Sequence, residues 1–410
     1  MTRLHDPYAA LRHRDYRLFL AGRALFTVAE QMLDVSIGWE LYERTHSALA
    51  LGIVGLVLVV PSIVLALPAG HTADRYDRRR IVIAAQGAFM ACALALAWLS
   101  FARGPVPLIY VCLLAGGVAL AFARPAASAL LPLLVPLADF PNAVTWNSSA
   151  FQVAAVVGPA LGGAVIGLRH EAGPAYVIAA GLVLACVACI ALLRARQATR
   201  PREEVTVRTL AAGLGFVWRS KVILAALTLD LFAVLFGGAT TLLPVFAKDI
   251  LHVGPVGFGW LRAAPSVGAL AMAVALTHRA PMRRAGRSLL LAVSGFGAAT
   301  IVFGLSRSFT LSMVMLFVLG ALDNISVVVR GTLVQVRTPD AMRGRVSAVN
   351  GVFIDTSNEL GGFESGLTAA IFGPVVSVVG GGILTILVVA GVAWAWPELR
   401  RMGALHEGAP

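Results

Sequence analysis

The chain has 410 residues, of which 58% are hydrophobic and 13% are charged. Soluble domains carry about 25% charged residues, so this composition excludes an ordinary soluble protein. The formal net charge of +12 could indicate a nucleic-acid partner, but the basic residues lie in short clusters between long apolar runs. That distribution is typical of a membrane protein, in which Lys and Arg fix the orientation of the loops.

Apolar runs of this kind need about 20 residues to cross a bilayer as helices. Twelve runs meet that length, and we predict an all-α integral membrane protein with twelve transmembrane helices in two six-helix pseudo-symmetric bundles. The runs comprise residues 17–43, 48–69, 81–102, 108–129, 143–168, 175–194, 221–247, 257–278, 288–306, 309–331, 346–372 and 377–396.

A polar segment at residues 195–220 separates the first six runs from the last six. Gly162-Gly163 in the fifth run has a counterpart in Gly361-Gly362 in the eleventh, which indicates a weak internal repeat. Transporters built from such repeats bind substrate near the bilayer midplane. The predicted domains are an N-terminal bundle (1–194), a cytoplasmic linker (195–220), a C-terminal bundle (221–396) and a cytoplasmic tail (397–410).

The basic residues distribute unequally between the two sides of the membrane. With the N-terminus inside, the cytoplasmic segments hold most of the Lys and Arg. The opposite side holds Arg44, Arg103, Arg169, Lys248 and Arg307. The positive-inside rule therefore predicts that both termini are cytoplasmic. Residues 1–17 lack the apolar core of a cleavable signal peptide, so we expect the first run to direct insertion.

Ionisable residues inside the first run are costly in a bilayer and therefore indicate function. Glu30 and Asp34 are four residues apart and share one helix face. Two such carboxylates away from water should bind protons more readily than free ones, as a proton-coupled transporter requires. We favour Asp34 for this role. The alternative is that one or both form a structural ion pair with Arg124 in the fourth run.

The second half offers a further set of ionisable residues inside its runs. Asp230 and Arg330 should both lie toward the cytoplasm, where they could form a gate salt bridge between the halves. Arg262 lies in the outer part of the eighth run, where a similar gate could form. Asp355 and Glu359 share a face of the eleventh run and are additional proton or substrate candidates. Structural pairing is the alternative for each.

Other functional motifs are absent from the sequence. It contains no P-loop, zinc-ligand spacing, haem motif or catalytic triad. We therefore expect no metal, no cofactor, no use of ATP and no enzymatic activity. Cys186-x-x-Cys189 has the spacing of a redox motif but lies in an apolar run, so we expect inert thiols.

The segment Gly70–Arg80 lies between the second and third runs and predicts a tight cytoplasmic hairpin loop. It resembles the signature G-x-L-A-D-R-x-G-R-R/K-R/K of the major facilitator superfamily, with Thr72 and Asp77 as departures. The resemblance implies that Asp74 contacts the start of the eleventh helix, near Arg345. It also implies a conformational latch made by Gly70, Asp74, Arg75 and Arg78.

The fifth run contains Gly158-Pro159 followed by Gly162-Gly163. This stretch resembles the antiporter motif of the same superfamily, with Ala154 in place of the first glycine. The resemblance implies export. Packing of small residues against a neighbouring helix in lipid is the alternative explanation.

Further stretches, including Thr45-His46-Ser47 and Thr338–Arg345, resemble the enterobactin exporter group. The resemblance implies a secondary active transporter of a bacterial inner membrane that exports small amphiphilic molecules, such as drugs or siderophores, by alternating access. We expect the proton gradient to supply the energy, and the chain to act as a monomer in the lipid bilayer. An importer or lipid flippase of the same fold is the first alternative, and a non-transporting membrane receptor is the second.

Overall fold

The computed structural model describes residues 6–194, 214–278 and 284–403, apart from the side chains of Asp74, Asp340, Ala341, Arg343 and Ala348. The described residues are almost entirely helical and include no β-strand, as the sequence predicts. By packing, the chain divides into two compact units. Unit 1 comprises residues 1–40 and 64–204, and unit 2 comprises residues 41–63 and 205–410.

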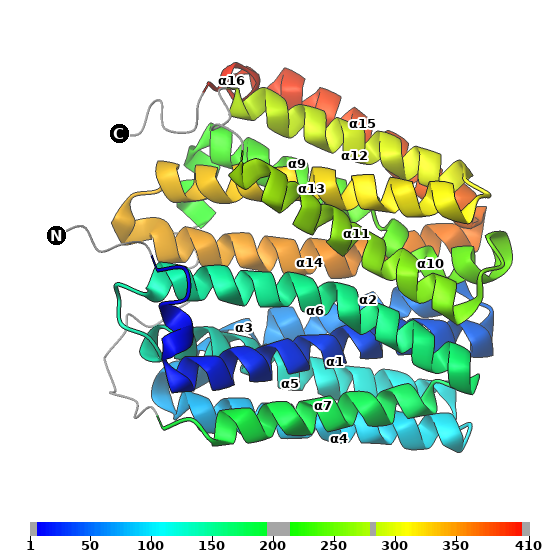
Figure 1. The fold of residues 1–410 in the computed structure, drawn as a ribbon. Coiled ribbons are helices and arrows are strands. Elements are labelled where there is room, and N and C mark those ends of the chain that lie inside the picture. Colours follow the sequence, from blue (N-terminus) through cyan, green and yellow to red (C-terminus); the bar gives the residue numbers. More distant parts are fainter. Residues whose placement is uncertain (1–5, 195–213, 279–283, 404–410) are drawn as a thin grey trace. The chain divides into compact units, whose positions relative to one another are not determined.

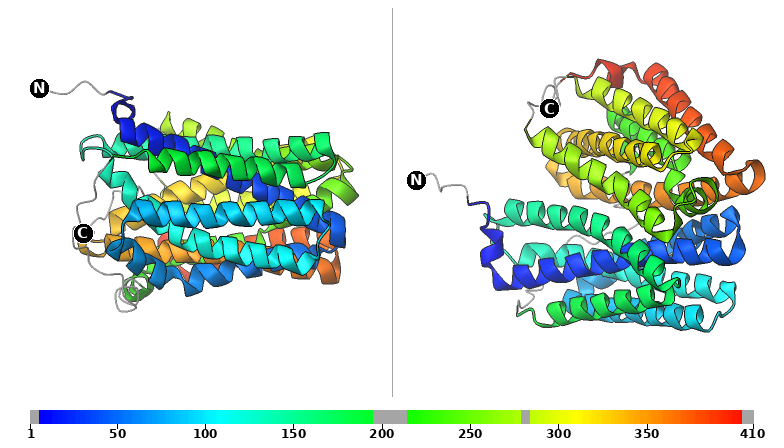
Figure 2. Two further views of the ribbon diagram at one scale, coloured as in Figure 1. Left: turned by 90° about the horizontal axis from the view of Figure 1, so that it is seen from below. Right: turned by 45° about the vertical axis from the view of Figure 1, so that its right-hand side comes forward.

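Unit 1 is built around six long helical stretches. They are α1 (Arg14–Thr45) as far as Glu40, α3 (Ala66–Arg75), α4 (Arg78–Phe101), α5 (Val106–Leu130), α6 (Phe140–Arg169) and α7 (Gly173–Ala191). α4 packs against both α5 and α7, and the three helices run side by side in Figures 1 and 2. The buried Tyr16 hydroxyl donates a hydrogen bond to the Ala143 carbonyl at 2.7 Å, which ties α1 to the start of α6.

Unit 2 contains the remaining helices. They are α2 (Ala48–Val64) as far as Ile63, α9 (Lys221–Phe236), α10 (Leu243–Val245), α11 (Gly254–Thr277), α12 (Ala285–Leu305), α13 (Phe309–Arg337), α14 (Asp340–Phe372), α15 (Pro374–Ala395) and α16 (Pro397–Arg401). α12 packs between α13 and α15, and α11 packs against α13. A π-helical turn at Phe246–Ile250 follows α10.

The second predicted span is bent. α2 and α3 meet at an angle of 51°, at a break around Leu65. Pro61 lies inside α2 and has no backbone N–H. The helix therefore lacks one hydrogen bond near the break, which makes it easier to bend there. The boundary between the two units, at residues 63 and 64, falls at the same break.

Nine helices of the described chain are long and apolar enough to cross a membrane, and the bent pair α2–α3 makes a tenth. The two remaining predicted spans correspond to α1 and α14, which are 32 and 33 residues long. Both helices are long enough to cross a membrane, but several ionisable residues in their central turns make them less apolar than the other ten spans. These are the helices in which the sequence places the acidic pairs.

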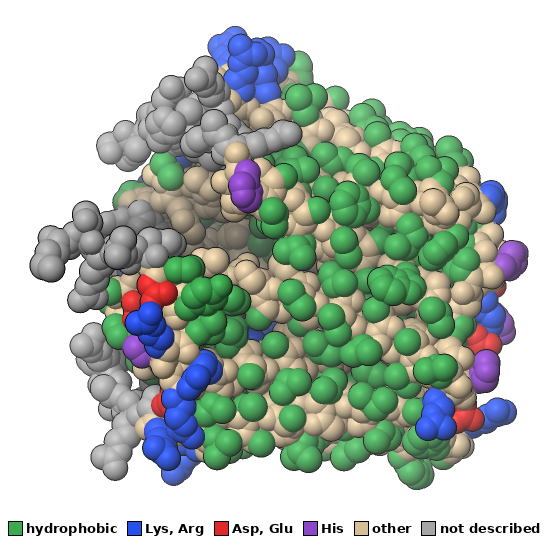
Figure 3. Space-filling view, viewed as in Figure 1, with side chains coloured by type: hydrophobic (Ala, Val, Ile, Leu, Met, Phe, Trp, Pro, Cys, Tyr) green, Lys and Arg blue, Asp and Glu red, His purple; other side chains and the backbone are tan. Residues whose placement is uncertain are grey.

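Large apolar side chains lie exposed along the flanks of the helices. Trp98 is 66% exposed, Leu291 72% and Trp394 85%. Figure 3 shows hydrophobic side chains over the middle of this face, with Lys, Arg, Asp and Glu gathered toward the helix ends. Such a surface is suited to lipid and not to water.

Candidate functional site

In unit 1, one of the two α1 carboxylates singled out by the sequence, Glu30, forms an ion pair with an arginine. Glu30 Oε1 accepts a hydrogen bond from Arg124 Nη2 of α5 at 3.0 Å, in a salt bridge between the two helices. The Arg124 side chain is 57% exposed and that of Glu30 is 21% exposed, so packing within unit 1 does not enclose the pair. The structure thus forms the Glu30–Arg124 contact that the sequence left as an alternative.

Asp34 lies one turn farther along α1 and is exposed, so its carboxylate is more open than that of Glu30. Asp34 is not without an interaction partner. Glu30 and Asp34 share one face of the helix, as their spacing predicts. Two carboxylates are therefore accessible at neighbouring turns of a membrane helix.

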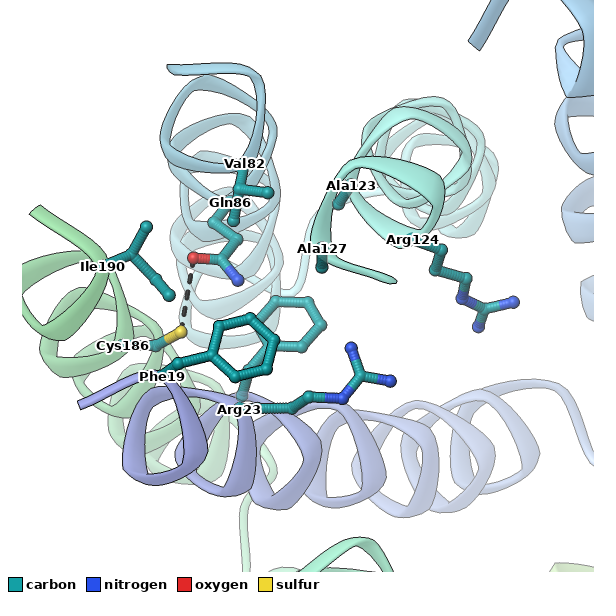
Figure 4. A pocket seen from close by; sticks show the side chains of 10 residues that line it. Phe19, Arg23, Val82, Gln86, Ala123, Arg124, Ala127, Cys186 and Ile190 are labelled. Carbon is teal, nitrogen blue, oxygen red and sulfur yellow. Dashed lines mark hydrogen bonds between the residues drawn. The ribbon is translucent and has the colours of Figure 1, made fainter. Parts of the chain in front are cut away.

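A small cavity opens beside this pair, inside unit 1. It is lined from α1 by Arg23 and Phe26, from α4 by Gln86, from α5 by Arg124 and from α7 by Cys186, among others. Figure 4 shows the Arg23 guanidinium turned toward the α5 side, where Arg124 lies. Its Nε is buried without a hydrogen-bond partner among the described residues.

Cys186 of α7 has a polar neighbour on another helix, although it lies in an apolar run of the sequence. Its Sγ donates a hydrogen bond to Gln86 Oε1 at 3.3 Å, drawn as a dashed line in Figure 4. Gln86 is itself buried and lies 100 residues away in sequence, so the sequence pattern around the cysteines could not reveal it. Cys186 and Cys189 are both free thiols.

The glycines of the antiporter-like motif hold α6 close to α1. A Cβ at Gly158 would lie 2.6 Å from Gln31 Cβ and 2.8 Å from the Val28 carbonyl oxygen, too close for any side chain. A Cβ at Gly162 would lie 3.2 Å from the carbonyl oxygen of Met32. The motif, including buried Pro159 and Gly163, therefore packs on the turns of α1 that carry Glu30.

The equivalent glycines of the second half play the same part inside unit 2. A Cβ at Gly361 would lie 2.8 Å from the Val234 carbonyl oxygen of α9, and one at Gly362 would lie 3.1 Å from Thr241 Oγ1. α14 thus packs on α9 as α6 packs on α1. The internal repeat predicted from the glycine pairs has this physical basis.

In unit 2, Asp230 of α9 forms an ion pair with Arg330 of α13. The side chains are 9% and 4% exposed, respectively. Both residues belong to unit 2, so the pair links two helices of one bundle and is not a bridge between the halves, contrary to the expectation. Arg262 is half-buried and forms no ion pair with the described residues.

A second small cavity adjoins this ion pair. Its lining includes Asp230, Asp323, Ser326 and Phe296. Asp323 forms no hydrogen bond or ion pair with the described residues, although it lies in the middle of α13. Asp323 falls within the predicted span 309–331, but its place beside Asp230 depends on packing that no local pattern encodes.

The acidic residues of α14 differ in their surroundings. Asp355 is exposed and forms no hydrogen bond with the described residues, whereas Glu359 is half-buried and has interactions within the described chain. The backbone of Glu359 is in contact with Gly55 of α2. Asp355 and Glu359 share a helix face, but no described residue joins them into one site.

A polar cluster that the sequence did not predict lies at the end of α1. The Tyr42 hydroxyl donates a hydrogen bond to Asp249, and Lys248 Nζ lies 2.9 Å from Glu43 Oε2. All four residues belong to unit 2. The partners are about half the chain apart in sequence, which is why no motif signals them.

The segment Gly70–Arg80 is more helical than predicted. Gly70 to Arg75 belong to α3, so the connection to α4 is only Tyr76 and Asp77. Asp77, which departs from the family signature, caps α4 by accepting a hydrogen bond from the Arg80 backbone N–H at 3.0 Å. The predicted loop is therefore too long at its start, because α3 continues through Gly70 as far as Arg75.

Arg78 fastens this connection to its surroundings. Its Nε donates to the Ala73 carbonyl at 3.1 Å and its Nη1 to the Ala129 carbonyl at 3.4 Å. Arg75 is exposed. The side chain of Asp74 lies outside the described residues, so its contact with the start of α14 stays a prediction. In the part of the chain that the structure describes, no cluster of His, Cys, Asp and Glu is arranged to hold a metal ion.

Comparison with known proteins agrees with this architecture. Residues 19–362 match the family model of the Major Facilitator Superfamily. Curated relatives include the enterobactin exporter EntS of Citrobacter koseri, 26% identical over 97% of this chain and 96% of its own length. EntS of Shigella boydii is 25% identical over 95% of this chain and 93% of its own.

Solved structures show the same fold at low identity. A bacterial homolog of the human lysosomal transporter Spinster, inward-facing and unoccupied, has a TM-score of 0.74 at 14% identity, covering 95% of this chain and 99% of that one. A POT family transporter in complex with 5-aminolevulinic acid has a TM-score of 0.74 at 11% identity, covering 95% and 97%. The chain is thus a multi-pass membrane transporter and not an enzyme, and it belongs to the Major Facilitator Superfamily.

Proposed function

We propose that this chain exports small amphiphilic molecules across a bacterial inner membrane, with protons moving inward in exchange. The observation that carries the proposal is the Glu30–Arg124 salt bridge inside membrane helices, with the exposed Asp34 one turn away. The curated relatives are named as exporters of enterobactin, which favours outward transport of a drug- or siderophore-like molecule.

Protonation of Glu30 would remove the negative charge that compensates Arg124. An ion pair inside a membrane helix is stable only while both partners remain charged, because a lone guanidinium is costly there. A proton arriving at Glu30 or Asp34 would therefore change the charge balance between α1 and α5. In alternating access, such a change favours one conformation over the other.

The energy source in this proposal is the proton gradient, with no cofactor and no ATP. The lipid bilayer and the small-molecule substrate are the partners, and the functional unit is a monomer. Both termini face the cytoplasm, in keeping with the excess of Lys and Arg in the segments on that side. The latch around Asp74 and Arg75 would act between conformations of the cycle, and Asp355 and Glu359 are secondary proton candidates.

The test is transport by the purified full chain in proteoliposomes, with the imposed pH gradient as the variable and a panel of acidic, basic and neutral amphiphilic dyes as probes. We expect gradient-driven movement of at least one dye, lost in Glu30→Gln and in Asp34→Asn. Glu398→Gln is the matched control, because Glu398 lies in α16, beyond the last predicted span, and pairs with Lys221 at the first residue of α9. Normal gradient-driven transport by both α1 variants would disprove the assignment.

An importer or a lipid flippase of the same fold is the second candidate. Oriented vesicles separate the candidates, because an exporter moves dye from the cytoplasmic face outward when protons are supplied on the opposite face. Movement only in the reverse direction would favour import.

A further inference from the structure

The cavity in unit 1 contains a guanidinium without a counter-ion of its own. Arg23 and Arg124 both line it, and Glu30 is the carboxylate that interacts electrostatically with Arg23. Glu30, however, is engaged by Arg124 at 3.0 Å. Arg23 forms no ion pair with any described residue, and its Nε has no hydrogen-bond partner among them. Of Arg23 and Arg124, only Arg124 has a salt bridge to the carboxylate of Glu30.

The polar lining of the cavity offers hydrogen-bond donors and hardly any acceptor. Arg23 provides N–H groups only. The Gln86 Oε1 is occupied by the Cys186 thiol, and Figure 4 shows the Gln86 amide nitrogen turned into the cavity. Phe19 and Phe26 supply the apolar walls. A donor-lined space beside a guanidinium without a salt bridge is complementary to an anionic acceptor.

The size of the cavity limits what it can hold. It leaves about 30 Å³ in which the centre of a water-sized group can lie, and it is open on one side. One water needs about 10–15 Å³ on the same measure, so the space fits a group of a few heavy atoms and not a whole amphiphile. The remainder of a ligand would extend through the opening, past Arg124.

We infer that this cavity is a head-group site that holds one carboxylate or ionised phenol of the transported molecule through Arg23 and the Gln86 amide. The inference names the substrate class for the proposed transport, amphiphiles with an acidic head group, and takes its biological meaning from that function. A planar acid could accept two parallel hydrogen bonds from the guanidinium, which a lysine could not provide. The phenylalanine rings would flank the ring or chain that carries the acid.

The test measures binding to the detergent-purified full chain without any gradient, by thermal unfolding and titration. Benzoate is the probe, benzamide is the neutral control of the same shape, and chloride is the inorganic control. We expect benzoate to raise the unfolding temperature, with no effect of benzamide or of chloride at the same concentration. Equal effects of benzoate and benzamide, or of benzoate and chloride, would overturn the inference.

Two variants of Arg23 separate ligand binding from a structural role. In Arg23→Met, benzoate should bind at least about tenfold more weakly, because the buried charge partner is gone. The ligand-free variant should also unfold at a higher temperature than the wild type, because an uncompensated guanidinium has been replaced by an apolar side chain of similar length. Arg23→Lys keeps the positive charge but loses the paired N–H groups of the guanidinium, so this variant should bind benzoate with intermediate affinity.

Lys221→Met is the matched control, since it removes an exposed cation at the first residue of α9, in the other unit, and should leave benzoate binding unchanged. Wild-type affinity in Arg23→Met, or a ligand-free variant less stable than the wild type, would contradict the inference. Proton-driven transport that depends on Glu30 but moves only neutral or basic dyes would overturn the head-group site and leave the proposed function intact. Benzoate binding by a chain whose transport does not depend on protons would overturn the proposed proton-coupled function and leave the head-group site intact.

Discussion

Two ion pairs inside the helices differ in how open they are to water. In the Glu30–Arg124 pair the arginine is 57% exposed, whereas in the Asp230–Arg330 pair neither side chain is more than 9% exposed. The first pair is not enclosed by packing, whereas the second is closed off. The Glu30 pair is therefore the more accessible of the two, and the Asp230 pair is suited to holding α9 and α13 together.

The buried pair should be needed for stability. Arg330→Met leaves the Asp230 carboxylate buried without its partner, and we expect a loss of about 3–5 kcal/mol in the free energy of unfolding. Thermal or denaturant unfolding of the detergent-purified protein measures the loss. The double variant Asp230→Leu with Arg330→Met should recover most of it, because no uncompensated charge is left.

The exposed pair between Lys221 and Glu398 provides the control for this experiment. Its atoms are 3.5 Å apart and the side chains are 71% and 47% exposed. Surface pairs of this kind contribute about 0–1 kcal/mol, so Lys221→Met should change stability little. An Arg330→Met variant as stable as Lys221→Met would show that the pair in unit 2 is not structural.

At the scale of helices, close approach through glycine organises each unit. α6 packs on α1 through Gly158 and Gly162, and α14 packs on α9 through Gly361 and Gly362. In lipid, where burial of apolar surface gains little, such close backbone contact is the main source of helix association. The seam between α6 and α1 also fixes the turn of α1 that presents Glu30.

Gly158→Val tests this seam. The new side chain would collide with Gln31 and with the Val28 carbonyl, so we expect a loss of about 1–3 kcal/mol in stability together with impaired transport. Gly181→Ala in α7 is the control, because no heavy atom lies within 4 Å of the added methyl group. It should be neutral or slightly stabilising, since alanine favours the helix. Equal effects of the two substitutions would argue against the seam.

The cap of α4 is a second prediction at this scale. Asp77→Ala removes the acceptor for the Arg80 backbone N–H and should cost about 0.5–2 kcal/mol. Asp77→Gly, which restores the residue of the family signature, should cost only about a few tenths of a kcal/mol. Thermal unfolding of the two variants compares them, and a larger cost for glycine than for alanine would contradict the capping role.

Helix positions were predictable from the sequence, whereas the Gly70–Arg80 connection was not. Runs of about 20 apolar residues have no stable alternative to a helix in lipid, so all twelve predicted spans correspond to helical segments. The glycine at position 70 indicated a turn, but glycine is also tolerated inside helices, and α3 passes through it. Glycine alone therefore did not locate the end of the helix.

The site residues divide in the same way. Glu30 and Asp34 could be found because a charge in an apolar run is visible in the sequence. The surroundings of Arg23, Asp323 and Cys186 could not, since each depends on which helices meet inside a bundle. The same holds for Tyr42 and Asp249, whose contact joins residues 207 positions apart.

At the scale of the whole chain, the two six-helix repeats carry opposite charges at similar places. Each unit has a small cavity lined by its first, third and fourth spans, with Arg23 and Arg124 in unit 1 but Asp230 and Asp323 in unit 2. The repeat thus preserves packing, as the glycine pairs show, while the ionisable groups have diverged. The proposed head-group site uses this difference, since an acidic group of the substrate would enter the cavity of unit 1, whereas the cavity of unit 2 presents carboxylates.

Proton coupling is tested most directly by measuring pH inside proteoliposomes that start without a pH gradient, while a transported dye flows down its own concentration gradient. If Glu30 and Asp34 carry the exchanged proton, dye flow through the wild type should drive protons in the opposite direction. The same flow through Glu30→Gln or Asp34→Asn should leave the internal pH unchanged. Dye flow through the wild type without any pH change, or an unaltered pH change in both variants, would contradict proton-coupled export.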